Sequence, residues 1–184
     1  EPGGAPYLAS LRIDQATDWE SFRKACTFSH IPGENMIWAD KKGNIGWQAV
    51  GIVPIRKNFS GYVPVPGDGR YEWGNYLPIK ERPHILNPSK GYFATANQHV
   101  TPDNYTRWDA VGYTWADPFR GDRVNQVLDQ NKKFTIEEMA QLQNDYFSIP
   151  ASQLVPLLKT IQLTDEASLA AKKYFDEWNF VLGM

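Results

Sequence analysis

Few side chains in this 184-residue sequence have types and spacing that could support chemistry by themselves. The one cysteine, Cys26, excludes an internal disulfide and a metal site built from several cysteines, and its apolar neighbours are typical of a small buried hydrophobe. The three histidines, His30, His84 and His99, lack the spacing of metal ligands, so we expect surface or locally hydrogen-bonded roles. Neither residue type therefore marks a catalytic centre.

The charge balance gives no support to two classes of partner. Nineteen Lys and Arg residues against twenty-one Asp and Glu residues give a formal charge of −2, so no electrostatic field marks a nucleic acid or an anionic membrane as partner. No run of about eighteen apolar residues occurs, and residues 1–10 lack the pattern of a signal peptide.

Seven Trp, nine Tyr and nine Phe residues suit a packed core and also pockets for flat or hydrophobic ligands.

A helix and a β-hairpin are expected early in the chain. Capping-box spacing at residues 17–20 and apolar residues on one face predict a helix from about residue 18 to 27. Apolar segments at residues 35–40 and 45–50 flank a Gly-Asn turn, which predicts two strands joined at residues 41–44.

The next stretch is interrupted by many prolines and glycines. Residues 53–88 therefore predict an extended excursion punctuated by turns, of the kind that serves a site or wraps another part of the protein. Residues 91–98 return to a strand pattern through Tyr92, Phe93, Ala94 and Thr95.

Residues 119–184 have the patterns of helices. A second capping box begins at Thr135 and ends at Glu138. Apolar residues at helical spacing predict four helices, marked by Val124, Val127 and Leu128; by Met139, Leu142 and Tyr146; by Leu154, Leu157, Leu158 and Ile161; and by Ala167, Ala170, Ala171, Tyr174 and Trp178. The predicted class is α+β, with a β-rich part at residues 1–118 and a helical segment at 119–184.

Four segments, in this order, resemble the β subunit of the penicillin acylase (penicillin amidase) family. They are residues 35–40 with 43–46, residues 63–67 with 71–73 and 77–78, residues 87–97, and residues 119–124 with 142–145. The first reads Asn-Met-Ile-Trp-Ala-Asp and then Gly-Asn-Ile-Gly, and the second begins Val-Pro-Val-Pro-Gly. The order and spacing of all four segments carry the resemblance, which no single short string would do.

The resemblance implies an N-terminal-nucleophile hydrolase and part of its four-layer sandwich. In that family the nucleophile is the first residue of the β subunit, usually Ser, whose α-amino group is the general base. Glu1 cannot fill this role, and Ser10 is internal. We therefore expect an internal fragment of the β subunit, inactive alone, whose partners are the remaining α and β subunit segments.

Two residues of this sequence match catalytic positions of the family. The resemblance implies that the Asn97 amide donates to the oxyanion of the tetrahedral intermediate, and that Arg123 orients backbone carbonyls and helps hold the N-terminal amine. The alternatives are that Asn97 merely ends a strand and turns the chain, and that Arg123 is a solvated residue paired with Asp122 or Asp117. Arg120 is a poorer candidate that is expected to face solvent.

The family resemblance also bears on metal, substrate and location. No cofactor is expected in this segment, although some relatives hold a structural Ca²⁺, for which Asp109 and a Gly61 carbonyl are the matching ligands. The implied substrate is an N-acyl amide such as a penicillin or an acyl-homoserine lactone. The implied location of the parent protein is the periplasm or the medium.

Two other functions stay open. The chain could be a noncatalytic ligand-binding module, in which a coplanar, exposed strip of tryptophans stacks on sugars or peptides. The residues for that strip are Trp38, Trp47, Trp73, Trp108 and Trp115. Alternatively, the chain could belong to a degenerate family member used only for assembly.

Overall fold

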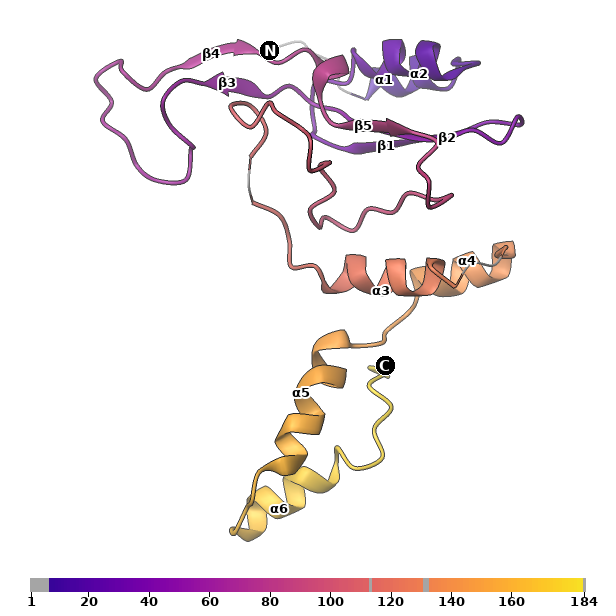
Figure 1. The fold of residues 1–184 in the computed structure, drawn as a ribbon, viewed down its shortest axis with the longest axis vertical. Coiled ribbons are helices and arrows are strands. Elements are labelled where there is room, and N and C mark those ends of the chain that lie inside the picture. The colour runs from indigo at the N-terminus through magenta and orange to yellow at the C-terminus, as the bar shows by residue number, and fades with distance from the viewer. Residues whose placement is uncertain (1–6, 113, 131–132, 184) are drawn as a thin grey trace. The chain divides into compact units, whose positions relative to one another are not determined.

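The computed structural model describes residues 7–112, 114–130 and 133–183 (Figure 1). These residues form two compact units. The first unit comprises the chain up to Thr95 together with His99–Ala116, and the second comprises Ala96–Gln98 together with Asp117–Met184. In the part of the chain that is described, no helix has both the length and the apolar character needed to cross a membrane.

The first unit is built on a three-stranded antiparallel sheet of order β1-β2-β5. Strands β1 (Asn35–Ala39) and β2 (Ile45–Ala49) confirm the predicted hairpin. Its turn is closed by Asp40, whose Oδ1 accepts from the backbone N–H groups of Lys42 at 2.8 Å and Asn44 at 3.0 Å. Short polar side chains of this kind stabilise tight turns locally, which explains why the hairpin could be predicted.

The proline-rich stretch contains more regular structure than its sequence indicates. Strand β5 (His84–Leu86) adds to the edge of β2, while β3 (Pro54–Arg56) and β4 (Trp73–Tyr76) form a separate antiparallel pair. A 3₁₀ turn, η1 (Ile79–Glu81), precedes β5. These elements are only three or four residues long, because prolines limit each ladder.

Helices α1 (Leu8–Ile13) and α2 (Trp19–Cys26) lie over one face of the sheet (Figure 1). Helix α2 confirms the predicted helix, whereas α1 was not predicted. The capping residue of α2 is Asp18 rather than Thr17, because the Asp18 carboxylate accepts from the Ser21 N–H and the Ser21 hydroxyl accepts from the Asp18 N–H. Phe22, Cys26, Trp38, Val50 and Ile79 form the buried cluster between helix and sheet.

Gly46 lies where α2 comes closest to the sheet. A Cβ at this position would lie within 2.9 Å of ring carbons Cε3 and Cη2 of Trp19. We expect Gly46→Ala to lower the free energy of unfolding by about 2–3 kcal/mol, because the indole must move out of a packed interface. Urea denaturation measures the change, with Gly67→Ala as the control, since a Cβ on Gly67 meets no atom within 4 Å. Equal losses in the two variants would contradict the close approach.

Cys26 is fully buried at the centre of this cluster, as its sequence context indicates. Burial raises the pKa of its thiol to about 11, despite an opposing effect of Arg23. At pH 8 roughly one thiol in a thousand is then ionised, so we expect native protein to react with a disulfide reagent far more slowly than protein unfolded in urea. Similar rates in the two states would show that Cys26 is accessible.

The opposite face of the sheet is covered by the chain that follows β5 (Figure 1). The ring of Phe93 stacks on that of Trp47 with a centroid distance of 4.6 Å and an interplanar angle of 14°. The predicted strand at residues 91–98 is wrong, because these residues are not part of a ladder. The aromatic ring of Phe93 contacts the face of the sheet instead of belonging to a strand at its edge.

The tryptophans do not form the coplanar exposed strip that a stacking module requires. Trp38 and Trp47 are buried, whereas Trp73 is 65% exposed. The rings of Trp108 and Trp115 meet edge to face at 85°. Most of these aromatic residues therefore pack within the first unit.

The second unit holds helices α3 (Phe119–Leu128), α4 (Ile136–Gln143), α5 (Ile149–Thr160) and α6 (Glu166–Lys173). All four predicted helices are present, and the capping box of Thr135 and Glu138 is confirmed. Helices α4 and α6 end earlier than predicted. Tyr146 lies beyond the end of α4, and Trp178 belongs to the final loop, where its Nε1 donates to the Val181 carbonyl.

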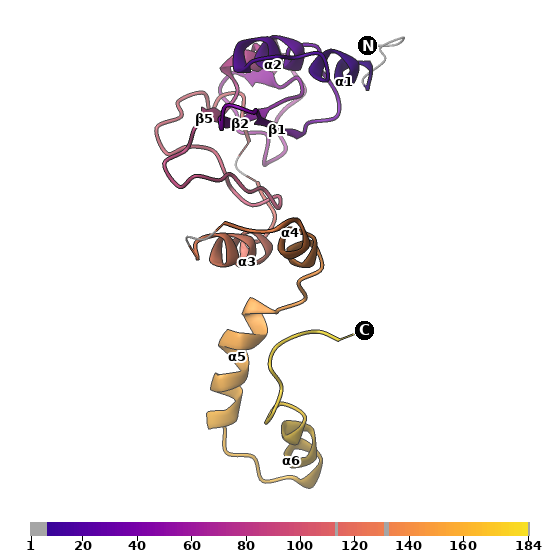
Figure 2. The ribbon, with the colours of Figure 1, turned by 90° about the vertical axis from the view of Figure 1, so that its right-hand side faces the viewer.

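Helix α6 returns beside the C-terminal end of α5 (Figure 2). The Lys172 ammonium donates to the carbonyls of Lys159 at 2.8 Å and Ile161 at 3.2 Å, which satisfies acceptors at the end of α5. The chain then runs antiparallel to residues 146–148, through a bridge between Phe147 and Val181.

Candidate functional site

Asn97 lies on a turn that belongs to the second unit, not at the end of a strand as predicted. Its backbone has a φ of +67°, in the left-handed region that asparagine tolerates better than most residues. Its side chain is exposed. The turn therefore presents the carboxamide on the surface of this unit.

The turn is held against the start of α3 by Gln98. The Gln98 Oε1 accepts from the Ala96 N–H at 2.6 Å, which closes the turn around Asn97. The same side chain lies against Gly121, where an added Cβ would come within 2.5 Å of Gln98 Cδ. A glycine in the first turn of α3 is therefore needed for this close approach.

Arg120 contacts Asn97 directly. Its Nη2 donates to Asn97 Oδ1 at 2.9 Å. Arg120 is exposed, as expected. The sequence did not predict that it also binds Asn97. The two residues are 23 positions apart, and no local sequence signal joins them.

Arg123 lies one turn further along α3 and forms a bidentate ion pair with Asp145. Its Nε donates to Asp145 Oδ1 at 3.1 Å and its Nη2 to Oδ2 at 2.7 Å, while Nη1 donates to Gln126 at 2.8 Å. The guanidinium also lies 4.6 Å from the centre of the Phe147 ring. The ion-pair partner of Arg123 is therefore Asp145, whereas the predicted alternative named Asp117 or Asp122. The bonds to Asp145 and Gln126 fix the plane of the guanidinium.

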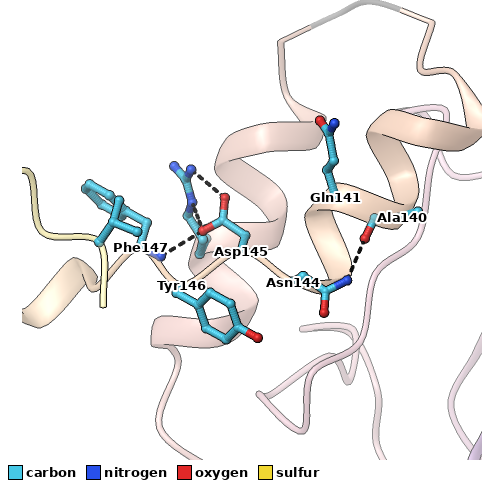
Figure 3. A pocket seen from close by; sticks show the side chains of 8 residues that line it. Ala140, Gln141, Asn144, Asp145, Tyr146 and Phe147 are labelled. Atoms are coloured by element: carbon cyan, nitrogen blue, oxygen red, sulfur yellow. Dashed lines mark hydrogen bonds and ion pairs between the residues drawn. The ribbon is translucent and has the colours of Figure 1, made fainter. Parts of the chain in front are cut away.

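Asp145 is itself held in one orientation. Its Oδ1 accepts from the Phe147 N–H at 2.9 Å, and Figure 3 shows this bond beside the Asn144 amide, which donates to the Ala140 carbonyl. The Arg123 guanidinium, followed by the Phe147 N–H, lowers the pKa of the carboxyl against the raising effect of burial. Asp145 was not predicted as a site residue, although it ends the last segment that carries the family resemblance.

Two cavities border this ion pair. One, of about 510 Å³, is lined by Ala96, Arg120 and Arg123 and by apolar side chains that include Phe119, Val124 and Leu142. The other, of about 540 Å³, is lined by Arg123, Asp145 and residues of α4 and the loop after it (Figure 3). The first cavity thus joins the Asn97 turn to the two arginines of α3.

Asp109, the predicted calcium ligand, lies in the first unit and pairs with Arg107. The Arg107 Nε and Nη2 donate to its two carboxylate oxygens, each at 3.1 Å. Among the described residues, no three His, Cys, Asp or Glu side chains gather as a metal site. A hard cation needs six to eight oxygen ligands, so this arrangement does not by itself fit Ca²⁺, and the assignment of Asp109 stays a prediction.

The fold is similar to that of the thermostable penicillin G acylase of Alcaligenes faecalis. The TM-score is 0.72 at 26% sequence identity, over 96% of this chain and 32% of that chain. The fold therefore places the chain among the N-terminal-nucleophile hydrolases, and its architecture is α+β as predicted. More narrowly, the family model for penicillin amidase matches residues 1–183, and the chain belongs to this family.

The relatives of this chain include acyl-homoserine lactone acylases and penicillin acylases. The chain is 30% identical over 154 residues to the acyl-homoserine lactone acylase QuiP of Pseudomonas aeruginosa, which covers 77% of the chain and 18% of that protein. It is 33% identical over 137 residues to the penicillin G acylase of Escherichia coli, which covers 73% of the chain and 16% of that protein. The chain thus spans less than a fifth of the length of these curated relatives.

Proposed function

We propose that this chain is a segment of an amidohydrolase that cleaves the amide bond of an N-acyl small molecule, such as a penicillin or an acyl-homoserine lactone. The reaction proceeds through an acyl-enzyme on an N-terminal Ser that lies outside these 184 residues. Family membership and the names of the relatives support this class of reaction. The observation that carries the role of this segment is the exposed Asn97 carboxamide, held by its oxygen.

Asn97 acts when the Ser hydroxyl oxygen bonds to the substrate carbonyl carbon. The carbonyl oxygen becomes an oxyanion, and the Asn97 Nδ2 donates a hydrogen bond to it. Among the described residues, none bonds to this Nδ2 group, because the side-chain oxygen rather than the nitrogen faces Arg120. Collapse of the intermediate breaks the C–N bond, the proton taken from Ser passes to the leaving amine, and water then hydrolyses the ester.

Arg123 acts as a fixed cation beside this centre. Its bonds to Asp145 and Gln126 use one hydrogen on each guanidinium nitrogen. Within the described part of the chain, this leaves one N–H on Nη1 and one on Nη2 that can bind backbone carbonyls and orient the N-terminal amine.

The parent protein completes the site with its remaining α and β subunit segments. By resemblance, the parent protein acts in the periplasm or outside the cell. The same resemblance supports the proposal that the parent protein binds a structural Ca²⁺ with Asp109 as one ligand.

The proposal is tested by expressing the full-length gene, including the segment that supplies the Ser. Release of free amine from penicillin G and from N-acyl-homoserine lactones is measured, with a Ser→Ala nucleophile variant as control. We expect hydrolysis of at least one substrate class and none by the control. A fully processed protein that hydrolyses neither class would instead favour the degenerate family member, whose role is assembly.

A further inference from the structure

We propose that Arg120 is a positioning residue that sets which end of the Asn97 carboxamide faces the reaction centre. This inference rests on the proposed function, because it concerns the donor that the function assigns to Asn97. The contact that motivates it is the hydrogen bond of 2.9 Å from Arg120 Nη2 to Asn97 Oδ1.

The chemistry of the two side chains makes this contact directional. A guanidinium has only N–H donors, so the atom of Asn97 that faces it must be the oxygen. The carboxamide nitrogen is then turned away from Arg120, with its two hydrogens available on the other side. An arginine therefore selects the donor orientation of an amide, whereas a carboxylate or hydroxyl at position 120 could not.

Without Arg120 the orientation would be weakly determined. The terminal torsion of asparagine has broad, roughly twofold preferences, and the Asn97 side chain is exposed, so water can satisfy either orientation. In the reversed orientation the carboxamide oxygen would face the oxyanion and repel it. The bond to Arg120 is also charge-assisted, and it polarises the amide so that Nδ2 becomes a better donor.

The turn itself has supports that do not depend on Arg120. The Gln98 side chain closes it through the Ala96 N–H and packs against Gly121. Removal of the Arg120 side chain therefore leaves the backbone of the turn in place and frees the carboxamide alone. For this reason the positioning role can be separated from a structural role.

The test uses the full-length, processed enzyme, with rates referred to active sites titrated by the acyl burst. Arg120→Met is expected to lower kcat about tenfold with KM changed less than about threefold, because the lost effect acts on the transition state. Arg120→Lys is expected to stay within about threefold of wild type, since an ammonium also donates only. Arg70→Met is the matched control, because Arg70 is an exposed arginine paired with Asp68.

A double-variant cycle separates the hypotheses. In an Asn97→Gly background, Arg120→Met is expected to cost less than about twofold, because no carboxamide remains to be oriented. An equal loss in both backgrounds, or an unchanged kcat for Arg120→Met, would overturn the positioning role. If Arg120→Met does not accumulate as folded enzyme, Arg120→Glu decides, because a carboxylate only accepts and cannot face the Asn97 oxygen; a kcat equal to that of wild type contradicts the proposal.

The same variants show separately whether the oxyanion-donor role of Asn97 is wrong. If Asn97→Gly itself retains the kcat of wild type, the proposed donor is wrong, whatever Arg120 does. If Asn97→Gly is strongly impaired and Arg120→Met is not, only the positioning role is lost.

Discussion

Asn97→Asp in the full-length enzyme is expected to lower kcat about a hundredfold to a thousandfold, because it removes one oxyanion donor and places a carboxylate there. Aspartate has nearly the same shape as asparagine and also tolerates the left-handed backbone at φ +67°. It would form an ion pair with Arg120, which keeps the turn folded. Steady-state kinetics on titrated enzyme measures the loss in kcat.

The control for this variant is Asn97→Gly. Glycine removes the carboxamide but adopts a positive φ without strain, so its loss in kcat reports the missing donor. Alanine is less suitable, because its Cβ adds backbone strain to the loss of the side chain. If both Asn97→Asp and Asn97→Gly retained at least a third of the kcat of wild type, Asn97 would have no role in the transition state.

Arg123→Met is expected to have the second large effect, on stability and on activity together. It leaves the Asp145 carboxylate, whose side chain is only 21% exposed, without its cationic partner. We expect a loss of about 2–3 kcal/mol in the free energy of unfolding at pH 7, together with a large fall in kcat as the reaction centre loses its fixed cation. Urea denaturation and steady-state kinetics measure the two effects.

The pH dependence of the stability loss identifies its cause. Arg123 lowers the pKa of Asp145 in the folded protein. The ion pair therefore stabilises the folded state fully above the ordinary carboxyl pKa of about 4, and this stabilisation is lost as the pH falls through the lowered pKa of Asp145. The stability gap between wild type and Arg123→Met should therefore narrow below about pH 4. A gap that is the same at pH 7 and pH 3 would show that packing against Phe147, rather than charge, is responsible. Asp145→Asn is the matched variant, since it removes the charge and keeps the shape.

Local signals explain what could be predicted from the sequence. The turn at Asp40, the helix start at Thr135 and the apolar faces of the four later helices each depend on residues within one or two turns of chain. For α2 the same kind of signal placed the helix correctly but misassigned its cap, because Asp18 and Ser21 satisfy each other better than Thr17 can.

Long-range contacts explain what could not be predicted. The stretch at residues 91–98 has strand composition, but Phe93 uses its ring to cover Trp47. β5 lies among prolines and is a strand only because β2, nearly forty residues earlier, offers an edge. Arg123 has acidic neighbours in sequence, yet its partner is Asp145, which the Phe147 N–H orients.

In the candidate site, too, some residues could be predicted from the sequence and others could not. Asn97 and Arg123 were predicted from short segments that resemble a family, and their chemistry follows from their residue types. Arg120 and Gln98, which hold the Asn97 turn, depend on the approach of that turn to α3. Periodicity does not encode such an approach, although the small residue Gly121 is the one sequence feature consistent with it.

The role of Asn97 as an oxyanion donor is tested most directly by a boronic acid analogue of the acyl group, which forms a tetrahedral adduct with the catalytic Ser. Its dissociation constant is compared with that of the matching carboxylic acid product in wild type and in Asn97→Gly. We expect the boronic acid to bind the variant about a hundredfold more weakly than wild type, while binding of the product changes less than about threefold. Equal losses for both ligands, or no loss for either, would contradict it.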